Sequence, residues 1–267
     1  MTAQSRYKEV ARPAILNLQR NFKLFPRAIC LISGSPRSGT SALCEWLGRQ
    51  RGVSAFPESR ILVSIHRFME EVQRFNSLER DIAGITNLAR QLVYGYYQSA
   101  PRILIGKKLL VDKEPLEPIA FPSKEYAKFI FNVKRLLPES KLLLAIRDPI
   151  ATIWSMSQRT WGSSLTNTET RRFTLEEHIE NWCSCAELIL SYRSDLNTYI
   201  VQFGHLINDP ESESRRIFEF LHLPEGNSFE PRPTHEIGFN HEEREKILCL
   251  VQPQLELLYS KGISDLS

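Results

Sequence analysis

The 267-residue sequence contains no long apolar run. No segment approaches the roughly 18 consecutive apolar residues that a membrane-spanning helix needs. Residues 1–27 also lack the continuous apolar core of a secretory signal peptide. We therefore expect no transmembrane segment and a cytoplasmic location.

Cysteine is scarce, and its five copies do not form a paired set. An odd number of cysteines argues against a disulfide scaffold, and no histidine stands at zinc-site spacing from them. Cys183 and Cys185 lie two positions apart in a helical pattern, so their side chains point in different directions. We expect reduced, packed thiols and no bound metal.

An excess of charge of either sign is also absent. The chain has 34 basic and 31 acidic residues, a formal net charge of +3. A nucleic-acid-binding protein would show a basic stripe, so this class is not expected. The sequence also shows no internal repeat and no low-complexity tract, which predicts one domain over 1–267. Local basic pockets for an anionic ligand remain compatible with this balance.

What the chain does contain is an alternation of short apolar runs and helical patterns. Strands are predicted at 28–32, 109–111, 142–146 and 198–203. Helices are predicted at 41–47, 124–137, 175–194 and 209–222, and 59–100 is mostly helical in pattern. This alternation predicts an α/β fold, in which a mainly parallel central sheet is flanked by helices on both faces.

Two further segments are distinctive. Residues 5–23 have the pattern of a basic amphipathic helix, so 1–27 is predicted to be a helical extension that packs on the domain rather than on a membrane surface. The stretch 162–174 is rich in serine and threonine, and it is the best candidate for a mobile lid.

A glycine-bounded loop follows the first predicted strand. Residues 34–40 read GSPRSGT and lead directly into a helical pattern. In this geometry, backbone N–H groups and a helix N-terminus surround a phosphate. An ATP-binding loop carries a lysine after its second glycine, but Thr40 stands there instead. The candidate phosphate ligands in this loop are Arg37, Ser38, Gly39, Thr40 and Ser41.

A second candidate phosphate site follows the most apolar predicted strand. Arg147 comes directly after it, and Ser155 lies two turns into the next predicted helix. Asp148 is the expected N-cap of that helix, with Pro149 at its first position. Taken alone, Arg147 and Asp148 also fit a surface ion pair. Together, the two motifs describe a ligand with phosphate groups at two separated ends.

These motifs resemble those of sulfotransferases that use 3′-phosphoadenosine 5′-phosphosulfate (PAPS). The run 33–41 is similar to their 5′-phosphosulfate loop, and Arg147 with Ser155 is similar to their 3′-phosphate motif. The stretch 200–210 looks like a later strand and helix start of that fold, although the family usually has Tyr-Glu where this chain has Phe203-Gly204. The resemblance implies a P-loop-like sulfotransferase fold and PAPS as co-substrate, without a metal.

The resemblance also implies catalytic roles. Glu58 is similar to the catalytic glutamate of tyrosylprotein sulfotransferases and would be the general base, although a carboxylate stabilised at a helix N-terminus is the alternative. Lys113 resembles the lysine that the family aims at the sulfuryl group; a solvated loop lysine is the alternative. Arg37 occupies the position where many relatives have a lysine that holds the bridging oxygen.

The expected function is transfer of a sulfuryl group from PAPS to a hydroxyl or amine acceptor. The region 60–105, with Tyr94, Tyr96 and Tyr97, is expected to form the acceptor side together with Trp161. The acceptor is left open among small molecules, carbohydrates, lipids and peptides, as is the oligomeric state. A non-catalytic nucleotide-binding module and a P-loop kinase are the alternative functions.

Overall fold

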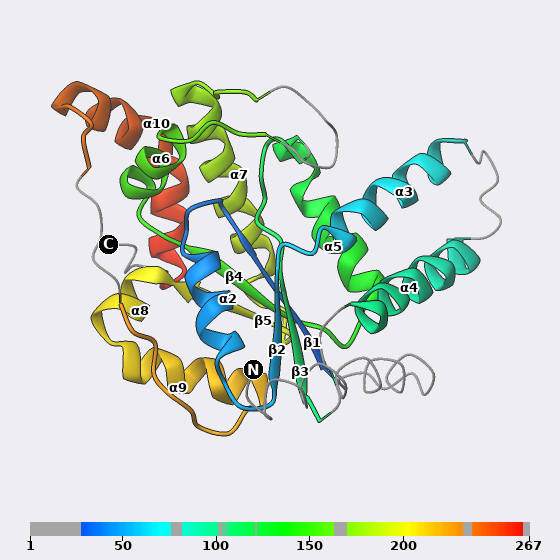
Figure 1. The fold of residues 1–267 in the computed structure, drawn as a ribbon. Helices are drawn as coiled ribbons and strands as arrows, with labels where there is room; N and C mark the ends of the chain where they lie inside the picture. The colour runs from blue at the N-terminus through cyan, green and yellow to red at the C-terminus, as the bar shows by residue number, and fades with distance from the viewer. Residues whose placement is uncertain are drawn as a thin grey trace, which may run out of the picture.

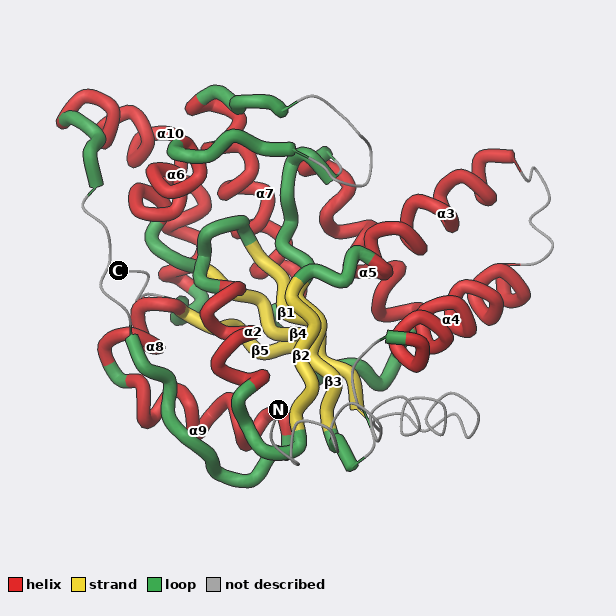
Figure 2. The backbone as a smooth tube through the Cα atoms, viewed as in Figure 1, coloured by secondary structure: helices red, strands yellow, loops and turns green. Residues whose placement is uncertain are grey.

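Five parallel strands form the centre of the fold in the computed structural model, which describes residues 28–75, 82–100, 104, 106–120, 122–162, 170–231 and 237–263. The strand order is β2-β3-β1-β4-β5. The strands are β1 (Ala28–Gly34), β2 (Val53–Pro57), β3 (Leu109–Lys113), β4 (Lys141–Ile146) and β5 (Thr198–Gln202). Figure 2 shows the sheet in yellow between helices on both sides. The predicted α/β architecture is confirmed.

Two apolar layers cover the sheet because alternate residues of each strand point to opposite faces. One layer joins Leu31, Leu110 and Leu144 to helices on the first face. These helices are α3 (Ile61–Phe75), α4 (Ile82–Ser99), α5 (Tyr126–Leu136), α6 (Pro149–Ser157), α7 (Leu175–Tyr192) and α10 (His241–Ser260). Strands buried on both faces read as near-continuous apolar runs, which is why most of them were predictable.

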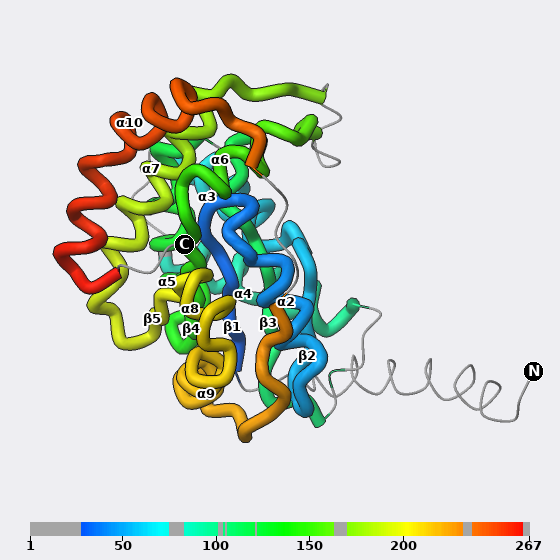
Figure 3. Tube along the Cα trace, turned by 90° about the vertical axis from the view of Figure 1, so that its left-hand side faces the viewer, coloured from blue at the N-terminus to red at the C-terminus, as the bar shows by residue number. Residues whose placement is uncertain are grey.

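The other layer joins Ile32, Val111 and Leu143 to three helices on the second face. These helices are α2 (Thr40–Gly48), α8 (Phe203–Asn208) and α9 (Pro210–Leu221), which lie together in front of the sheet in Figure 1. On the first face, α10 lies along α7, as Figure 3 shows.

The structure corrects the predicted elements in two places. No strand was predicted at residues 53–57, but they form β2, an edge strand that pairs with β3. Phe203 was predicted at the end of a strand, but β5 ends at Gln202 and Phe203 begins α8. The single helical region predicted at 59–100 contains α3 and α4.

Two predictions fall wholly or mostly outside the described residues. The helical extension 1–27 lies outside them, as do residues 163–169 of the predicted lid. The flanks of the lid are held together, because Trp161 and Arg171 exchange two backbone hydrogen bonds of 2.8 and 2.7 Å. Among the described helices, none combines the length and apolar character that crossing a membrane requires.

Candidate active site

The predicted phosphate loop connects β1 to α2 and depends on two glycines. A Cβ atom at Gly34, where φ is +135°, would lie 2.2 Å from the carbonyl oxygen of Ala145 in β4. A Cβ at Gly39, where φ is +91°, would lie 2.1 Å from the ring of Phe203. The loop therefore packs so closely on β4 and α8 that neither position accepts a side chain without rearrangement.

Gly39 also directs the N-terminus of α2 into the site. Thr40 begins this helix, Gly39 caps it without a side-chain hydrogen bond, and its first turn carries no acidic residue. The first N–H groups of a helix have no acceptor within the helix, and together with the helix dipole they favour an anion. The start of α2 therefore has the properties of a phosphate site.

The second phosphate motif begins where β4 ends. The Asp148 carboxylate accepts a hydrogen bond of 2.7 Å from the Ala151 N–H, so the predicted N-cap of α6 is confirmed, with Pro149 in its first turn. The indole of Trp182 donates to the Arg147 carbonyl at 3.1 Å. The Arg147 guanidinium stands 5.3 Å from the ring centroid of Phe203. Phe203 thus packs against both phosphate motifs.

A pair of opposite charges lies at the carboxyl ends of β2 and β3. The parallel register places Pro57 opposite Lys113, and the next residue, Glu58, donates its N–H to the Lys113 carbonyl at 3.0 Å. Lys113 Nζ forms a salt bridge with Glu58 Oε1 and also donates to Ser41 Oγ at 2.9 Å. Lys113 is only 4% exposed. It therefore joins the candidate base to the first turn of α2.

Arg60 holds the other oxygen of Glu58. Its guanidinium lies 3.0 Å from Glu58 Oε2 and 2.7 Å from Glu117 Oε2. Glu58 and Arg60 both have left-handed backbone conformations, with φ of 60° and 61°. Such a conformation costs a residue with a side chain on the order of 1–2 kcal/mol, so the surrounding contacts must hold this turn in place.

Burial and neighbouring charges shift the pKa of two groups in the site, Glu58 and Arg37. Burial alone would raise the pKa of Glu58, but the hydrogen bond and charge of Lys113, with Arg60 and Arg159, hold that pKa below its usual value. Glu58 is therefore ionised at neutral pH. Burial and the nearby charges of Arg159 and Arg147 lower the pKa of Arg37. Cations that repel one another in this way favour a bound anion.

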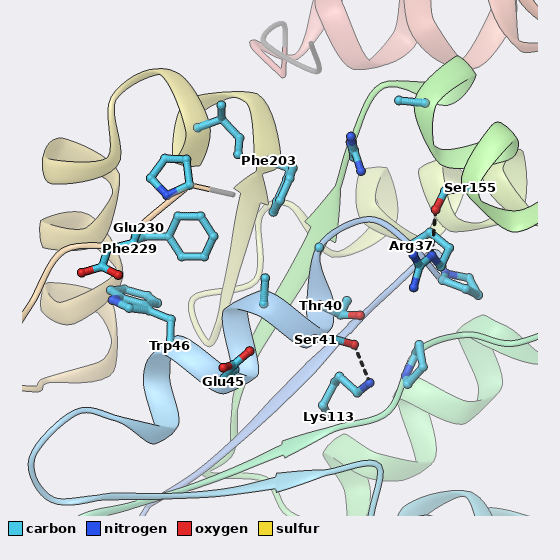
Figure 4. A pocket seen from close by; sticks show the side chains of 18 of the residues that line it. Arg37, Thr40, Ser41, Glu45, Trp46, Lys113, Ser155, Phe203, Phe229 and Glu230 are labelled. Atoms are coloured by element: carbon cyan, nitrogen blue, oxygen red, sulfur yellow. Dashed lines mark hydrogen bonds between the residues drawn. The ribbon is translucent and has the colours of Figure 1, made fainter. Parts of the chain in front are cut away.

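Both phosphate motifs, Glu58 and Lys113 border one cavity of ≈ 940 Å³ (Figure 4). Of the residues predicted from the sequence, its lining includes Arg37, Gly39, Thr40, Ser41, Glu58, Lys113, Arg147, Ser155 and Trp161. Ser38 is the exception, because it is fully buried and its hydroxyl donates to the Ser35 carbonyl at 2.6 Å. Its side chain stabilises the loop instead of facing the cavity.

A sequence model of the sulfotransferase family matches residues 30–227, which include both phosphate motifs, Glu58 and Lys113. The chain belongs to the sulfotransferase family. A crystal structure of a sulfotransferase from Alicyclobacillus acidocaldarius has the same fold, with a TM-score of 0.58 and 15% sequence identity. The match covers 91% of this chain and 98% of the chain in that crystal structure.

Curated relatives match a similar part of the chain. Protein-tyrosine sulfotransferase A of Caenorhabditis elegans is 25% identical over 209 residues, covering 72% of this chain and 49% of the relative. Nodulation protein NoeE of Sinorhizobium fredii is 24% identical over 221 residues, with the same two coverages. The chain thus spans about half the length of these relatives.

The cavity also contains aromatic and basic residues that the sequence reasoning missed. Trp46 and Phe229 form one wall, with their ring centroids 6.0 Å apart, and Phe203 stands 6.3 Å from Phe229. Arg159, at the end of α6, adds a cation. In the sequence Arg159 follows Ser155 by four positions, and in the structure it lies two residues after the last residue of α6. Phe229 lies far from the motifs in sequence.

A second hollow of ≈ 400 Å³ lies beside the C-terminal end of α4. Its lining comprises Phe56, Pro57, Glu58, Ser59, Tyr96, Ser99 and Ala100. Of the described residues, Glu58 alone lines both this hollow and the larger cavity. Of the three tyrosines expected on the acceptor side, Tyr96 lines this hollow, whereas Tyr97 is fully buried and Tyr94 packs against the core.

One buried histidine and three buried cysteines line neither hollow. His66 is buried and joined to Asn132 by a hydrogen bond of 3.0 Å. Cys30, Cys44 and Cys185 are buried free thiols. Within the described part of the chain, no group of three His, Cys, Asp or Glu side chains is arranged to hold a metal ion.

Proposed function

We propose that this sulfotransferase uses PAPS as its donor and transfers the sulfuryl group to a hydroxyl acceptor, with Glu58 as the general base. The observation that carries the proposal is that Glu58, Lys113, the N-terminus of α2 and the Arg147–Ser155 motif share one cavity. An ATP site would need a lysine at the position of Thr40. A donor with phosphates at its 3′ and 5′ positions needs two anion sites, and the two phosphate motifs would supply them.

The residues of the cavity fit such a donor along its length. The loop glycines, the start of α2 and Arg37 suit the 5′ end, where backbone donors and a fixed cation are available. Arg147 and Ser155 suit the 3′-phosphate, with Arg159 as a further cation. Trp46 and Phe229 suit the adenine, because aromatic rings bind bases by stacking.

The proposed chemistry divides between one base and several cations. The donor supplies the sulfuryl group and a phosphate as the leaving group. Glu58 takes the proton of the acceptor hydroxyl while its oxygen bonds to sulfur and the bond from sulfur to the phosphate oxygen breaks. Lys113 and Arg37 stabilise the charge that develops on that phosphate. Lys113 suits this role because it lies between Ser41 and Glu58.

The acceptor side is proposed to be the smaller hollow. Glu58 borders this hollow and also the larger cavity, so a hydroxyl entering beside Tyr96 would meet the base on one side and the donor on the other. Apart from Glu58, the described residues that line this hollow carry no charge. This lining supports an uncharged acceptor group at the point of entry.

The test has two stages. Calorimetry with 3′-phosphoadenosine 5′-phosphate (PAP), the product nucleotide, should show binding that does not require magnesium. Incubation with radiolabelled PAPS and a panel of phenols, sugars, lipids and peptides should then label one class of acceptor. Absence of PAP binding contradicts the proposal. Tight magnesium-dependent ATP binding would indicate a kinase, and donor binding without transfer to any acceptor would indicate a binding module.

A further inference from the structure

The last two residues of β3, Asp112 and Lys113, both bind the turn that carries Glu58. Successive side chains of a strand point to opposite faces of the sheet, so Asp112 and Lys113 project in opposite directions. Lys113 binds the Glu58 carboxylate. Asp112 binds the next residue of the turn, because its carboxylate accepts the Ser59 N–H at 3.3 Å and also the Ser59 hydroxyl.

Asp112 lies in the core, where its carboxylate accepts these hydrogen bonds. It is fully buried, and the Tyr97 hydroxyl donates to the same oxygen that accepts from the Ser59 hydroxyl. A buried carboxylate is costly unless its oxygens are satisfied, and these hydrogen bonds satisfy them. Burial raises the pKa of Asp112, while the hydrogen bonds from Ser59 and Tyr97 oppose that rise.

The contact is needed because of the backbone on either side of Ser59. Glu58 and Arg60 both hold left-handed conformations, which relax unless other contacts maintain them. Ser59 is the residue between them, and Asp112 fixes its N–H and its hydroxyl. No described residue other than Asp112 accepts a hydrogen bond from the Ser59 N–H.

We propose that Asp112 is a positioning residue that acts through Ser59 to hold the Glu58 carboxylate against Lys113. Asp112 touches neither of the two hollows, so it has no direct part in the chemistry. The catalytic meaning of this contact rests on the proposed function, in which Glu58 is the base. The contact itself can be tested without any substrate.

The readout is the titration of Glu58, followed by NMR of carboxyl-labelled glutamate and assigned by loss of the signal in Glu58→Gln. Lys113, Arg60 and Arg159 are the charged groups that lower the pKa of Glu58. In Ser59→Ala, where no charge changes, we expect the Glu58 midpoint to rise by about one pH unit as its carboxylate leaves Lys113.

Asp112→Asn provides a second test of the same contact. Because burial and Asp112 both raise the pKa of the neighbouring Glu114, this variant also changes the charge beside Glu58, so its Glu58 midpoint is compared with that of Ser59→Ala, which changes no charge. The asparagine amide cannot accept the hydroxyl hydrogen bonds that the replaced oxygen accepts, so the same rise is expected as in Ser59→Ala.

Ser140→Ala is the matched control, because it removes another buried hydroxyl that donates to a carbonyl, that of Leu137 at 2.6 Å. Its Glu58 midpoint should equal that of the unmodified protein. An unchanged midpoint in Ser59→Ala overturns the proposal, as does an equal shift in Ser140→Ala. If the unmodified protein fails to bind PAP in calorimetry, the proposed function fails, while the titration still decides the role of Asp112.

Discussion

Arg37 Nε donates a hydrogen bond of 2.8 Å to Ser155 Oγ. This bond joins the loop after β1 to the second turn of α6, although the two residues are far apart in the sequence. Each was predicted as a ligand of a different phosphate. The contact brings the two phosphate motifs to one end of the sheet, where a single doubly phosphorylated nucleotide can engage both.

Arg147→Ala tests the 3′-phosphate site. A hydrogen bond to a charged group contributes about 1.5–3 kcal/mol, so the affinity for PAP should fall by roughly 10- to 150-fold. Calorimetry with PAP measures the change. Arg74→Ala, which alters an exposed arginine paired with Glu71 on α3, serves as the control and should bind PAP normally. Equal affinity in Arg147→Ala would remove Arg147 from the site.

Glu58→Gln tests the proposed base. Glutamine keeps the shape of the side chain but cannot take a proton, so turnover should fall by about 10²- to 10⁴-fold while PAP affinity stays similar. Steady-state transfer to an acceptor from the panel measures this. Glu71→Gln changes an exposed carboxylate on α3 and should retain full turnover. Undiminished transfer by Glu58→Gln would show that another group accepts the proton.

The salt bridge between Lys113 and Glu58 predicts a pH dependence. Because the pKa of Glu58 is lowered, the carboxylate form persists to pH values below the usual glutamate range, and activity should fall only as the pH drops through that lowered pKa. Because the folded-state pKa of Glu58 is the lower one, the salt bridge stabilises the folded protein at pH values above the unfolded-state pKa of Glu58. This stabilisation is lost as the pH falls through the folded-state pKa.

Lys113→Met removes the largest of the contributions that lower the pKa of Glu58, so burial is then opposed only by the charges of Arg60 and Arg159. The acidic limb of the rate profile should therefore move to higher pH, and residual activity should be low. Lys128→Met, which breaks an exposed pair with Glu70, should leave the limb in place. If the acidic limb lies at the same pH in Lys113→Met and in the unmodified protein, the assignment of that limb to Glu58 is contradicted.

Gly39→Ala tests the packing of the phosphate loop. The added Cβ meets the Phe203 ring, so unfolding free energy should fall by about 1–3 kcal/mol and PAP affinity should also fall. Adding Phe203→Leu should recover part of the stability. The Cβ added in Gly34→Ala would meet the backbone carbonyl of Ala145 in β4. No second substitution that shortens a side chain can relieve that clash.

Thermal unfolding measures both glycine variants. Gly95→Ala in α4 is the control, because nothing lies within 4 Å of the added Cβ, and alanine at a helical position should raise stability by up to about 1 kcal/mol. A Gly39→Ala protein as stable as the unmodified one would show that the loop can move away from Phe203.

Several parts of the site were predictable because their signals are local. An apolar run followed by GSPRSGT, and another followed by Arg147-Asp148-Pro149, each encode a strand end, a turn and a helix start within a few residues. The Asp148 cap of α6 illustrates this, since donor and acceptor are three positions apart. The edge strand β2 was missed because its residues, VSAFP, include a proline and form no continuous apolar run.

The sequence by itself determined the alternation of strands and helices, the two phosphate motifs and the family to which they belong. The tertiary structure decided which distant residues meet. The β2–β3 register sets Glu58 beside Lys113, the opposite faces of β3 put Asp112 on the other side of the same turn, and the packing of α2 brings Trp46 to Phe229. These contacts depend on long-range pairing and packing, and no local pattern of residues encodes them.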